Sequence, residues 1–247
     1  MSWYFTADWH LNHSNIIKYC NRPFLSIEEQ ELVEASYKGL IPIKSIRISP
    51  DSVERMNSAI IDATNNVVKE EDNLVILGDF CWSSTPREKI SELVSRLRCK
   101  NRYLVWGNHD NRQTFLPFFK STYDYYLFCI EGQHVFTIHY PCKSWPQSSY
   151  GSWMLYGHVH NKLWNQDNGV MSEQEENNLK DILSKYDVSC EKINDLAKSI
   201  GSVFRKKSLS LDVGVDNRRE GVPFGTPWSF SEIKFYMESK LVSNVLT

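Results

Sequence analysis

The hydrophobic pattern of the chain consists of short apolar runs that end in a glycine or a polar residue. Five of these runs occupy residues 3–7, 74–77, 103–106, 135–138 and 153–156, and they are rich in β-branched and aromatic side chains. Runs of this length and composition are typical of buried β-strands. Residues 209–215 alternate apolar and polar positions, which predicts a final strand.

Segments with helical spacing of apolar residues lie between some of the runs. One opens at Pro50 and continues to residue 67 or 68, and we expect a helix there. A second helix is expected to have Thr85 as its N-cap and Pro86 at its first position, and to end near Leu97. Because strands and helices alternate along the chain, the pattern predicts a layered α/β fold.

Two stretches interrupt this alternation. Residues 26–52 contain no clear strand, and residues 165–207 are polar with a helical pattern and end in three basic residues. We expect both to be insertions within a single domain that spans residues 1–247. Each insertion is expected to be a lid, an oligomer contact or a solvated surface segment.

Composition narrows the possible classes of protein. With 247 residues, the chain is long enough for one α/β domain with a large core. Its formal net charge of −2 gives no global indication of a nucleic-acid binder, although a local basic patch stays possible. We expect no membrane contact, because no stretch approaches the roughly 20 apolar residues that span a bilayer. The six cysteines form no CxxC pair and the first residues lack the pattern of a secretory signal, so a cytoplasmic location is expected.

Six of the seven histidines lie in, or within three residues of, five short motifs, each of which follows one of the apolar runs. In chain order the motifs are Asp8-Trp9-His10, Gly78-Asp79, Gly107-Asn108-His109-Asp110, His139 and Gly157-His158-Val159-His160. Open α/β sheets place their sites beyond the carboxyl ends of their strands, so we expect the motifs to meet. Imidazoles, carboxylates and an amide are ligands that hold divalent metals.

The spacing within the motifs favours a pair of metals. Asp8 and His10 are two residues apart, which puts both side chains on one face at a strand end. Asp79 is the natural bridge, because a carboxylate has two oxygens and can contact two cations. Two metals about 3.5–4 Å apart can clamp a phosphate and share a hydroxide that attacks phosphorus in line with the leaving oxygen.

In this order the motifs resemble the pattern D-x-H, G-D, G-N-H-[DE], H and G-H-x-H of the calcineurin-like metallophosphoesterase superfamily, over residues 1–160. Asn21-Arg22-Pro23-Phe24, His139-Tyr140-Pro141 and Val213-Gly214-Val215-Asp216 extend the similarity to a branch of bacterial and phage phosphoesterases. The resemblance implies a four-layer α/β/β/α sandwich, in which two mixed β-sheets are flanked by helices. Both expected insertions depart from the compact form of that branch.

The resemblance also implies roles for the motif residues. His109 would lie over the scissile phosphate, where it would protonate the leaving group or stabilise developing charge. Asp110 would orient His109 through its ring N–H. One metal would be held by Asp8, His10, Asp79 and His160, and the other by Asp79, Asn108, His139 and His158.

Residues near the motifs have two interpretations each. His13 is either a surface or packing histidine, or a residue that contacts the phosphate of the substrate or supports the metal ligands from the same loop. Arg22 either forms a structural ion pair or binds phosphate, since its forked guanidinium matches phosphate geometry. His134, within a strand pattern, is expected to be structural. Four tryptophans either stack on a nucleobase or belong to the core and rim: Trp9, Trp82, Trp106 and Trp145.

The expected function is metal-dependent hydrolysis of phosphate esters, by a phosphodiesterase acting on nucleotide-like or other small substrates. The expected cofactors are two divalent metal ions, with Mn²⁺ for activity in vitro and Fe, Zn or Ni as alternatives. A nuclease is a second hypothesis, which needs a basic surface at the metals from Lys38, Lys44, Arg47 and residues 205–207. A protein-binding scaffold without catalysis is a third, although every motif residue of the pattern is present.

Overall fold

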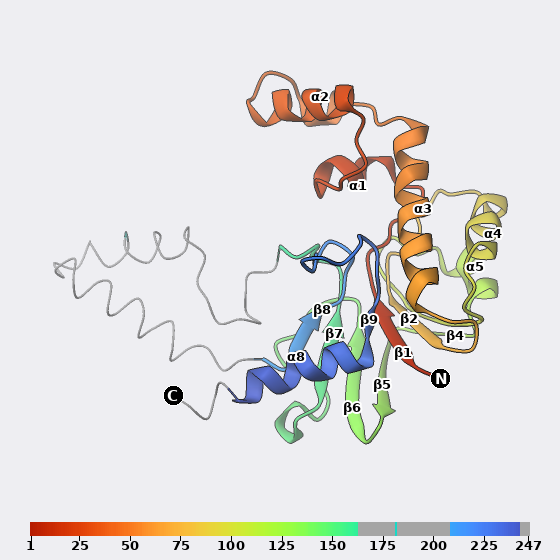
Figure 1. Ribbon diagram of the computed structural model, residues 1–247, viewed down its shortest axis with the longest axis vertical. Helices are drawn as coiled ribbons and strands as arrows, with labels where there is room; N and C mark the ends of the chain where they lie inside the picture. Colours follow the sequence, from red (N-terminus) through yellow and green to blue (C-terminus); the bar gives the residue numbers. More distant parts are fainter. Residues whose placement is uncertain (163–180, 182–207, 243–247) are drawn as a thin grey trace.

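Two mixed β-sheets pack face to face and are flanked by helices (Figure 1). The computed structural model describes residues 1–162, 181 and 208–242. The first sheet has the order β4-β3-β2-β1-β9, formed by β1 (Trp3–Thr6), β2 (Asn73–Leu77), β3 (Asn101–Val105), β4 (Ser121–Tyr123) and β9 (Trp228–Ser229). The second has the order β5-β6-β7-β8, formed by β5 (Tyr125–Ile130), β6 (Gln133–Ile138), β7 (Trp153–Tyr156) and β8 (Ser210–Asp212). The predicted fold class of two mixed sheets with flanking helices is confirmed.

Strand directions bring most carboxyl ends to the same side of each sheet. Strands β1 to β4 run parallel to one another, and so do β6, β7 and β8. All five apolar runs form strands, as predicted. The expectation that residues 209–215 form the final strand was wrong in one respect, because β9 follows β8 and pairs antiparallel with β1. A strand of two residues carries no periodic signal in the sequence.

The central strand β2 is buried on both of its faces. Successive side chains of a strand point to opposite sides. Leu74 accordingly packs in a core with Ile60 of α3 (Pro50–Val67), whereas Val75 packs between the two sheets with Leu155 of β7. A strand covered on both sides reads as a continuous apolar run, which is what residues 74–77 show.

The two predicted helices occur with one change of boundary. Helix α3 begins at Pro50 and ends at Val67, and the side chain of Ser49 caps it by accepting the N–H of Ser52. Helix α4 (Arg87–Ser95) begins one residue later than predicted and has Pro86 as its N-cap. The hydroxyl of Thr85 does not cap α4 because it accepts hydrogen bonds from Asn12 Nδ2 and Cys81 Sγ.

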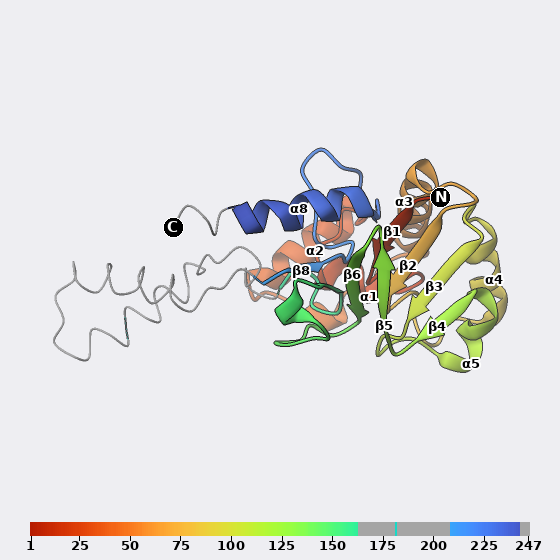
Figure 2. The ribbon, with the colours of Figure 1, turned by 90° about the horizontal axis from the view of Figure 1, so that it is seen from below.

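The remaining helices lie around the sheets. They are α1 (Ser14–Tyr19), α2 (Ile27–Tyr37), α5 (Arg112–Phe115), α8 (Phe230–Val242) and the short 3-10 helices Ile43–Ser45, Leu116–Phe118 and Ser148–Tyr150. Helix α8 runs along the sandwich near β1 and β8 and inserts Ile233 and Met237 into the core between the sheets (Figure 2). Among residues 1–162 and 208–242, no helix is both long and apolar enough to cross a lipid bilayer.

The first expected insertion contains α2 and one 3-10 helix and projects beyond the sheets with α1 (Figure 1). The carboxylate of Glu29 anchors it, because it accepts the N–H groups of Ser26 and Ser49 and the hydroxyl of Ser52 at the start of α3. The second expected insertion, residues 165–207, lies outside the described residues apart from Asp181.

Candidate metal centre

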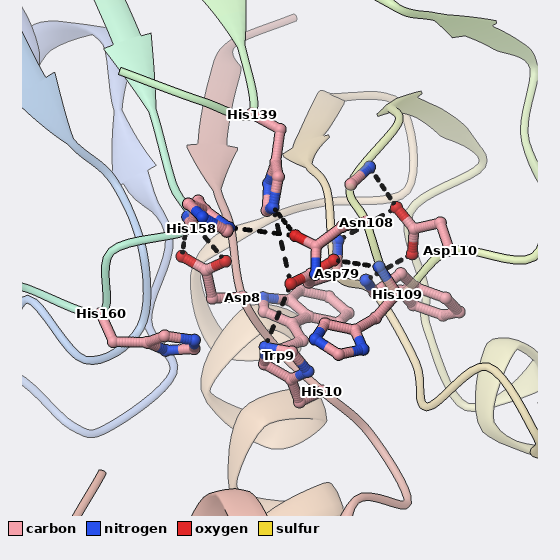
Figure 3. Close-up of polar contacts among 12 residues, drawn as sticks. Asp8, Trp9, His10, Asp79, Asn108, His109, Asp110, His139, His158 and His160 are labelled. Atoms are coloured by element: carbon pink, nitrogen blue, oxygen red, sulfur yellow. Dashed lines mark hydrogen bonds and ion pairs between the residues drawn. The ribbon is translucent and has the colours of Figure 1, made fainter. Parts of the chain in front are cut away.

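The five motifs meet where the carboxyl ends of strands from the two sheets come together (Figure 3). Asp8 follows β1, Asp79 follows β2 and Asn108 follows β3, all from the first sheet. His139 follows β6 and His158 follows β7, both from the second sheet. Parallel neighbours within each sheet, and the face-to-face packing of the sheets, therefore gather side chains that lie up to 150 residues apart in sequence.

Among the described residues, three groups of ligand atoms are close enough to hold a metal ion, and two of these groups consist of motif residues. In each group the three candidate atoms lie within 4.8 Å of one another. The first group is Asp8, His10 and His160, and the second is Asp79, His139 and His158.

Asp79 lies between the two groups. Its Oδ2 is 3.3 Å from Nε2 of His10 and 3.5 Å from Nε2 of His139. The side-chain oxygen of Asn108 lies 3.1 Å from Nε2 of His139 and 3.0 Å from Nδ1 of His158, so it joins the second group. The carboxylate of Asp79 thus lies with candidate ligands of the first group on one side and candidate ligands of the second group on the other.

The backbone is left-handed at five of the seven candidate ligands. The φ angles are +58° at Asp8, +48° at His10, +55° at Asp79, +73° at His158 and +49° at His160. Residues other than glycine rarely adopt this conformation, and such strain concentrates at functional sites whose surroundings hold it in place. Here the carboxylate of Asp8 accepts the N–H of His158 at 2.9 Å, which is one such restraint.

Glycines next to the ligands leave space for carboxylates. A Cβ atom at Gly157 would lie 2.8 Å from Oδ2 of Asp8, and one at Gly214 would lie 2.6 Å from the same oxygen. Neither position has room for a side chain, because a Cβ at Gly157 would also lie 2.5 Å from Cβ of Ala7, and one at Gly214 would lie 2.9 Å from Oδ1 of Asp212. The packing thus explains the glycine of the Gly-His-x-His motif and identifies a second glycine, beyond β8, with the same effect.

Hydrogen bonds orient the imidazoles so that a second nitrogen stays available. Nδ1 of His139 donates to the carbonyl of Leu77 at 2.7 Å, and Nδ1 of His160 lies 2.7 Å from Oδ2 of Asp216. Within the described part of the chain, neither ring nitrogen of His10 has a hydrogen-bond partner, although the residue is buried. A buried polar atom without a partner is costly. The orphaned nitrogens of His10 therefore fit a residue whose partner is a metal ion.

The electrostatics fit bound cations. Burial raises the pKa of Asp8 to about 7 and lowers the pKa of His10 to about 2, so His10 is a neutral imidazole. Burial alone would also raise the pKa of Asp79, but its hydrogen bond to His139 and the charge of that imidazole hold the pKa well below its ordinary range. A neighbouring cation would favour the charged form of Asp8 in the same way.

The centre has a closed side and an open side. Asp8, His10, Asp79 and His139 are all at most 1% exposed and form its floor. Asn108 is exposed, and His109, His158 and His160 are partly exposed. A substrate would therefore reach the candidate metal positions from the side that Asn108, His109, His158 and His160 form.

Asp110 makes contacts that differ from the prediction. Its Oδ2 accepts the N–H groups of Gly107 and Asp79 at 2.8 and 3.0 Å, and its Oδ1 accepts the N–H of Phe80 at 2.9 Å. The carboxylate is therefore directed at the backbone of two loops and not at the ring of His109. Burial raises the pKa of Asp110 to about 6.

His109 lies at the open side of the centre, next to the first group. Its backbone N–H donates to Oδ1 of Asp79 at 2.9 Å. The centroid of its ring is 5.2 Å from that of His10 and 5.1 Å from that of Trp82. The ring is thus near the candidate metal positions without belonging to either group of ligands.

Arg22 forms the ion pair that was one of its two interpretations. It is 1% exposed, and its Nε and Nη2 donate to the two carboxylate oxygens of Asp216 at 3.0 and 2.7 Å. Because the guanidinium is buried and paired, the phosphate-contact interpretation is corrected.

His13 and Trp82 form a stacked pair beside the centre. Their ring centroids are 3.8 Å apart with an interplanar angle of 16°, and the His13 ring is 5.4 Å from that of His10. Burial, followed by the charge of His109, lowers the pKa of His13 to about 4. The Nδ1 of His13 is buried and has no hydrogen-bond partner among residues 1–162 and 208–242. Phosphate contact by His13 stays a prediction.

The other three tryptophans are poor candidates for a stacking surface. Trp9 is fully buried and donates through Nε1 to Thr6 Oγ1, and Trp106 is also buried. Trp145 packs against the outer face of the second sheet and donates to the carbonyl of Ser152. His134 is exposed on β6.

Asp216 is a site residue to which the sequence analysis gave no role. Its carboxylate contacts the ring of His160 and the guanidinium of Arg22, and it is buried. The signal that could have identified it is the one used for the other motifs. Asp216 is a carboxylate directly after the apolar-polar alternation of residues 209–215.

The fold and the site define a two-sheet α/β protein with a candidate centre for divalent metals. A family model described as calcineurin-like phosphoesterase matches residues 1–199, and the chain belongs to this family. It is 31% identical over 157 residues to the "Uncharacterized protein MJ1445" of Methanocaldococcus jannaschii, a match that covers 64% of this chain and 68% of the relative. Its fold is similar to the crystal structure of the "Protein of Unknown Function AQ665" from Aquifex aeolicus. That similarity has a TM-score of 0.53 and 19% identity, and it covers 95% of this chain and 98% of the other.

Membership of the family supports metal-dependent hydrolysis of phosphate esters as the class of reaction. The candidate ligand groups are consistent with it.

Proposed function

We propose that the protein is a dinuclear metal-dependent phosphodiesterase that hydrolyses nucleotide-like or other small phosphate esters. Asp8, His10, Asp79 and His160 would hold one ion, and Asp79, Asn108, His139 and His158 the other. When bound, two divalent ions would neutralise the phosphate oxygens and lower the pKa of water toward neutrality.

The observation that carries the proposal is the position of Asp79. The same carboxylate oxygen lies 3.3 Å from a nitrogen of His10 and 3.5 Å from a nitrogen of His139, one on each side. Two isolated metal sites would not need a shared oxygen. A phosphate ester that contacts both ions would be held across the open side of the centre.

The remaining residues of the centre would act on the substrate. His109 lies on the open side, where it would donate a proton to the leaving oxygen of a bound ester. The His13–Trp82 stack lies next to His109, with Trp82 and His109 centroids 5.1 Å apart. A flat leaving group, such as an aryl group or a nucleoside, would find an aromatic neighbour there, which favours the nucleotide-like class of substrate.

The experiment is a substrate panel with each candidate metal. Bis(p-nitrophenyl) phosphate, p-nitrophenyl phosphate, cyclic nucleotides and a polynucleotide would be tested with Mn²⁺, Fe²⁺, Zn²⁺ and Ni²⁺. We expect the diester to be the better aryl substrate, with Mn²⁺ giving the highest rate. Asp79→Ala should abolish turnover, whereas Glu31→Gln, an exposed carboxylate on α2, should leave it unchanged.

Two results would argue against the proposal. Tight binding of two metal ions without turnover of any phosphate ester would favour a scaffold without catalysis. Preferential cleavage of the polynucleotide, with a steep loss of affinity as salt increases, would favour a nuclease.

A further inference from the structure

We infer that Arg22 and Asp216 are positioning residues that fix His160 and the Asp8 loop for the first metal ion. The inference rests on the proposed dinuclear centre and concerns only the group of Asp8, His10 and His160. Neither Arg22 nor Asp216 would contact the ion. They would set the orientation of the side chains that do.

Asp216 determines which nitrogen of His160 is free. Its Oδ2 lies 2.7 Å from Nδ1 of His160 and would keep a proton on that atom. Nε2 is then the nitrogen with a free lone pair, which is the arrangement of a histidine ligand held by a carboxylate. His160 is only partly buried and has a left-handed backbone, and this hydrogen bond restrains its ring together with contacts to Cys20 and to the ring of His10.

Arg22 connects Asp216 to the loop that carries the other two ligands. Nη2 donates to the carbonyl of Asp8 at 2.7 Å, and Nη1 donates to the carbonyl of Trp9 at 2.8 Å. Nε and Nη2 also bind the carboxylate of Asp216, and Nη1 contacts Met56 Sδ at 3.3 Å. All five N–H groups of the guanidinium are thereby used. One buried side chain thus links the turn containing Asp8 and His10 to the partner of His160.

The surroundings of Asp216 and His160 are a poor site for a third metal ion. Cys20, His160 and Asp216 have ligand atoms within 4.8 Å of one another, as a metal site requires. However, the guanidinium of Arg22 already occupies both oxygens of Asp216, and its positive charge would repel a cation there. The geometry therefore favours a hydrogen-bonded relay from Arg22 through Asp216 to His160.

Metal binding measured by titration calorimetry tests the inference without turnover. The wild-type protein should bind two Zn²⁺ or Mn²⁺ ions. Asp216→Asn should weaken the binding of one of them by about 10–100-fold, because an amide has a single acceptor oxygen and its NH2 group would face an N–H donor of Arg22 or His160. Arg22→Lys keeps the charge but loses the fork and should have the same effect. The second ion should keep its affinity in both variants.

The matched control is Glu29→Gln, which alters a buried carboxylate in another hydrogen-bonded network, between α2 and α3. It should lose stability without a change in the affinity of either ion. Equal affinity changes in Asp216→Asn and Glu29→Gln would overturn the inference, because they would reflect general destabilisation. Unchanged binding of both ions in Arg22→Lys and Asp216→Asn would also overturn it.

A measurement on the wild-type protein decides the case if the variants do not fold. In the Zn²⁺-loaded protein, nitrogen-15 NMR of the imidazoles should find a proton on Nδ1 of His160 and none on Nε2. A proton on Nε2, or three bound ions per chain, would overturn the inference. A protein that binds both ions as described but hydrolyses no phosphate ester would contradict the proposed function and leave this inference intact.

Discussion

Oδ2 of Asp110 accepts the backbone N–H of Asp79 at 3.0 Å and the backbone N–H of Gly107 at 2.8 Å. One oxygen thus joins the loop after β2, which carries the proposed bridging ligand, to the loop after β3. With Oδ1 bound to the N–H of Phe80, the carboxylate satisfies three backbone donors next to the centre. Asp110 therefore helps to hold together the loops that carry Asp79 and Asn108, through contacts that differ from those expected of a residue that orients His109.

We predict that Asp110→Asn lowers both metal affinity and turnover. An amide has one acceptor oxygen, so at least one of the three N–H groups would lose its partner, at a cost of about 1–3 kcal/mol of stability. Metal affinity and kcat should each fall by roughly 10–100-fold, as for other residues that hold ligands in place. Calorimetry and steady-state kinetics measure these effects. Asp124→Asn, an exposed carboxylate paired with Arg112, serves as the control, and equal results for both variants would contradict the prediction.

A second prediction concerns His109. Its ring is close to the centre but outside both ligand groups, so His109→Ala should retain both metal ions. Loss of a proton donor should lower kcat by about 10²–10⁴-fold for esters with alkyl leaving groups. Esters with p-nitrophenolate, which leaves without protonation, should be affected much less. A uniform loss across leaving groups would exclude proton donation, and His134→Ala on the exposed face of β6 should have no effect.

Gly214 provides a third prediction. A methyl group there would lie 2.6 Å from Oδ2 of Asp8 and 2.9 Å from Oδ1 of Asp212. Gly214→Ala should therefore displace Asp8. We expect a stability loss of about 1–3 kcal/mol from overpacking and a lower affinity for the first metal ion. Gly132→Ala is the comparison, because a Cβ at Gly132 meets nothing within 4 Å although its φ is +82°. That variant should lose stability from backbone strain while its metal affinity stays normal.

A fourth prediction concerns Glu29 and pH. Burial alone would raise its pKa, but hydrogen bonds from Ser52, Ser49 and Ser26 hold that pKa below the ordinary value of 4.5. A carboxylate with a lowered folded-state pKa stabilises the fold above its unfolded-state pKa and loses this effect as pH falls through the folded-state pKa. Glu29→Gln should cost about 1–2 kcal/mol of unfolding free energy at pH 7. The difference from wild type should shrink below pH 4.5.

Urea unfolding at pH 7 and near pH 3 measures this difference. Glu31→Gln, on the exposed side of the same helix, should match wild type at both pH values. A constant difference between Glu29→Gln and wild type across the pH range would mean that the ionised carboxylate is not the source of the stabilisation.

Hydrophobic periodicity predicted the strands well because the apolar side chains of β2 and its neighbours pack into the core, so that burial is visible in the local sequence. A run such as residues 74–77 is apolar at every position since both faces of the strand are covered, and the same run ends where the chain turns toward the centre. The helix at Pro50–Val67 was equally clear from the proline at its start and its apolar face. By contrast, β9 and the start of α4 depended on pairing and hydrogen bonds with distant residues, for which no local pattern exists.

The sequence by itself determined the chemical types of the candidate ligands and their places beyond strand ends, because each motif is local. Only the tertiary structure decided that Arg22 pairs with Asp216, 194 residues away, and that Asp110 binds backbone N–H groups of two loops. A guanidinium or a carboxylate has several possible partners of suitable chemistry. Which partner it finds depends on the packing of the two sheets, and not on the spacing of residues along the chain.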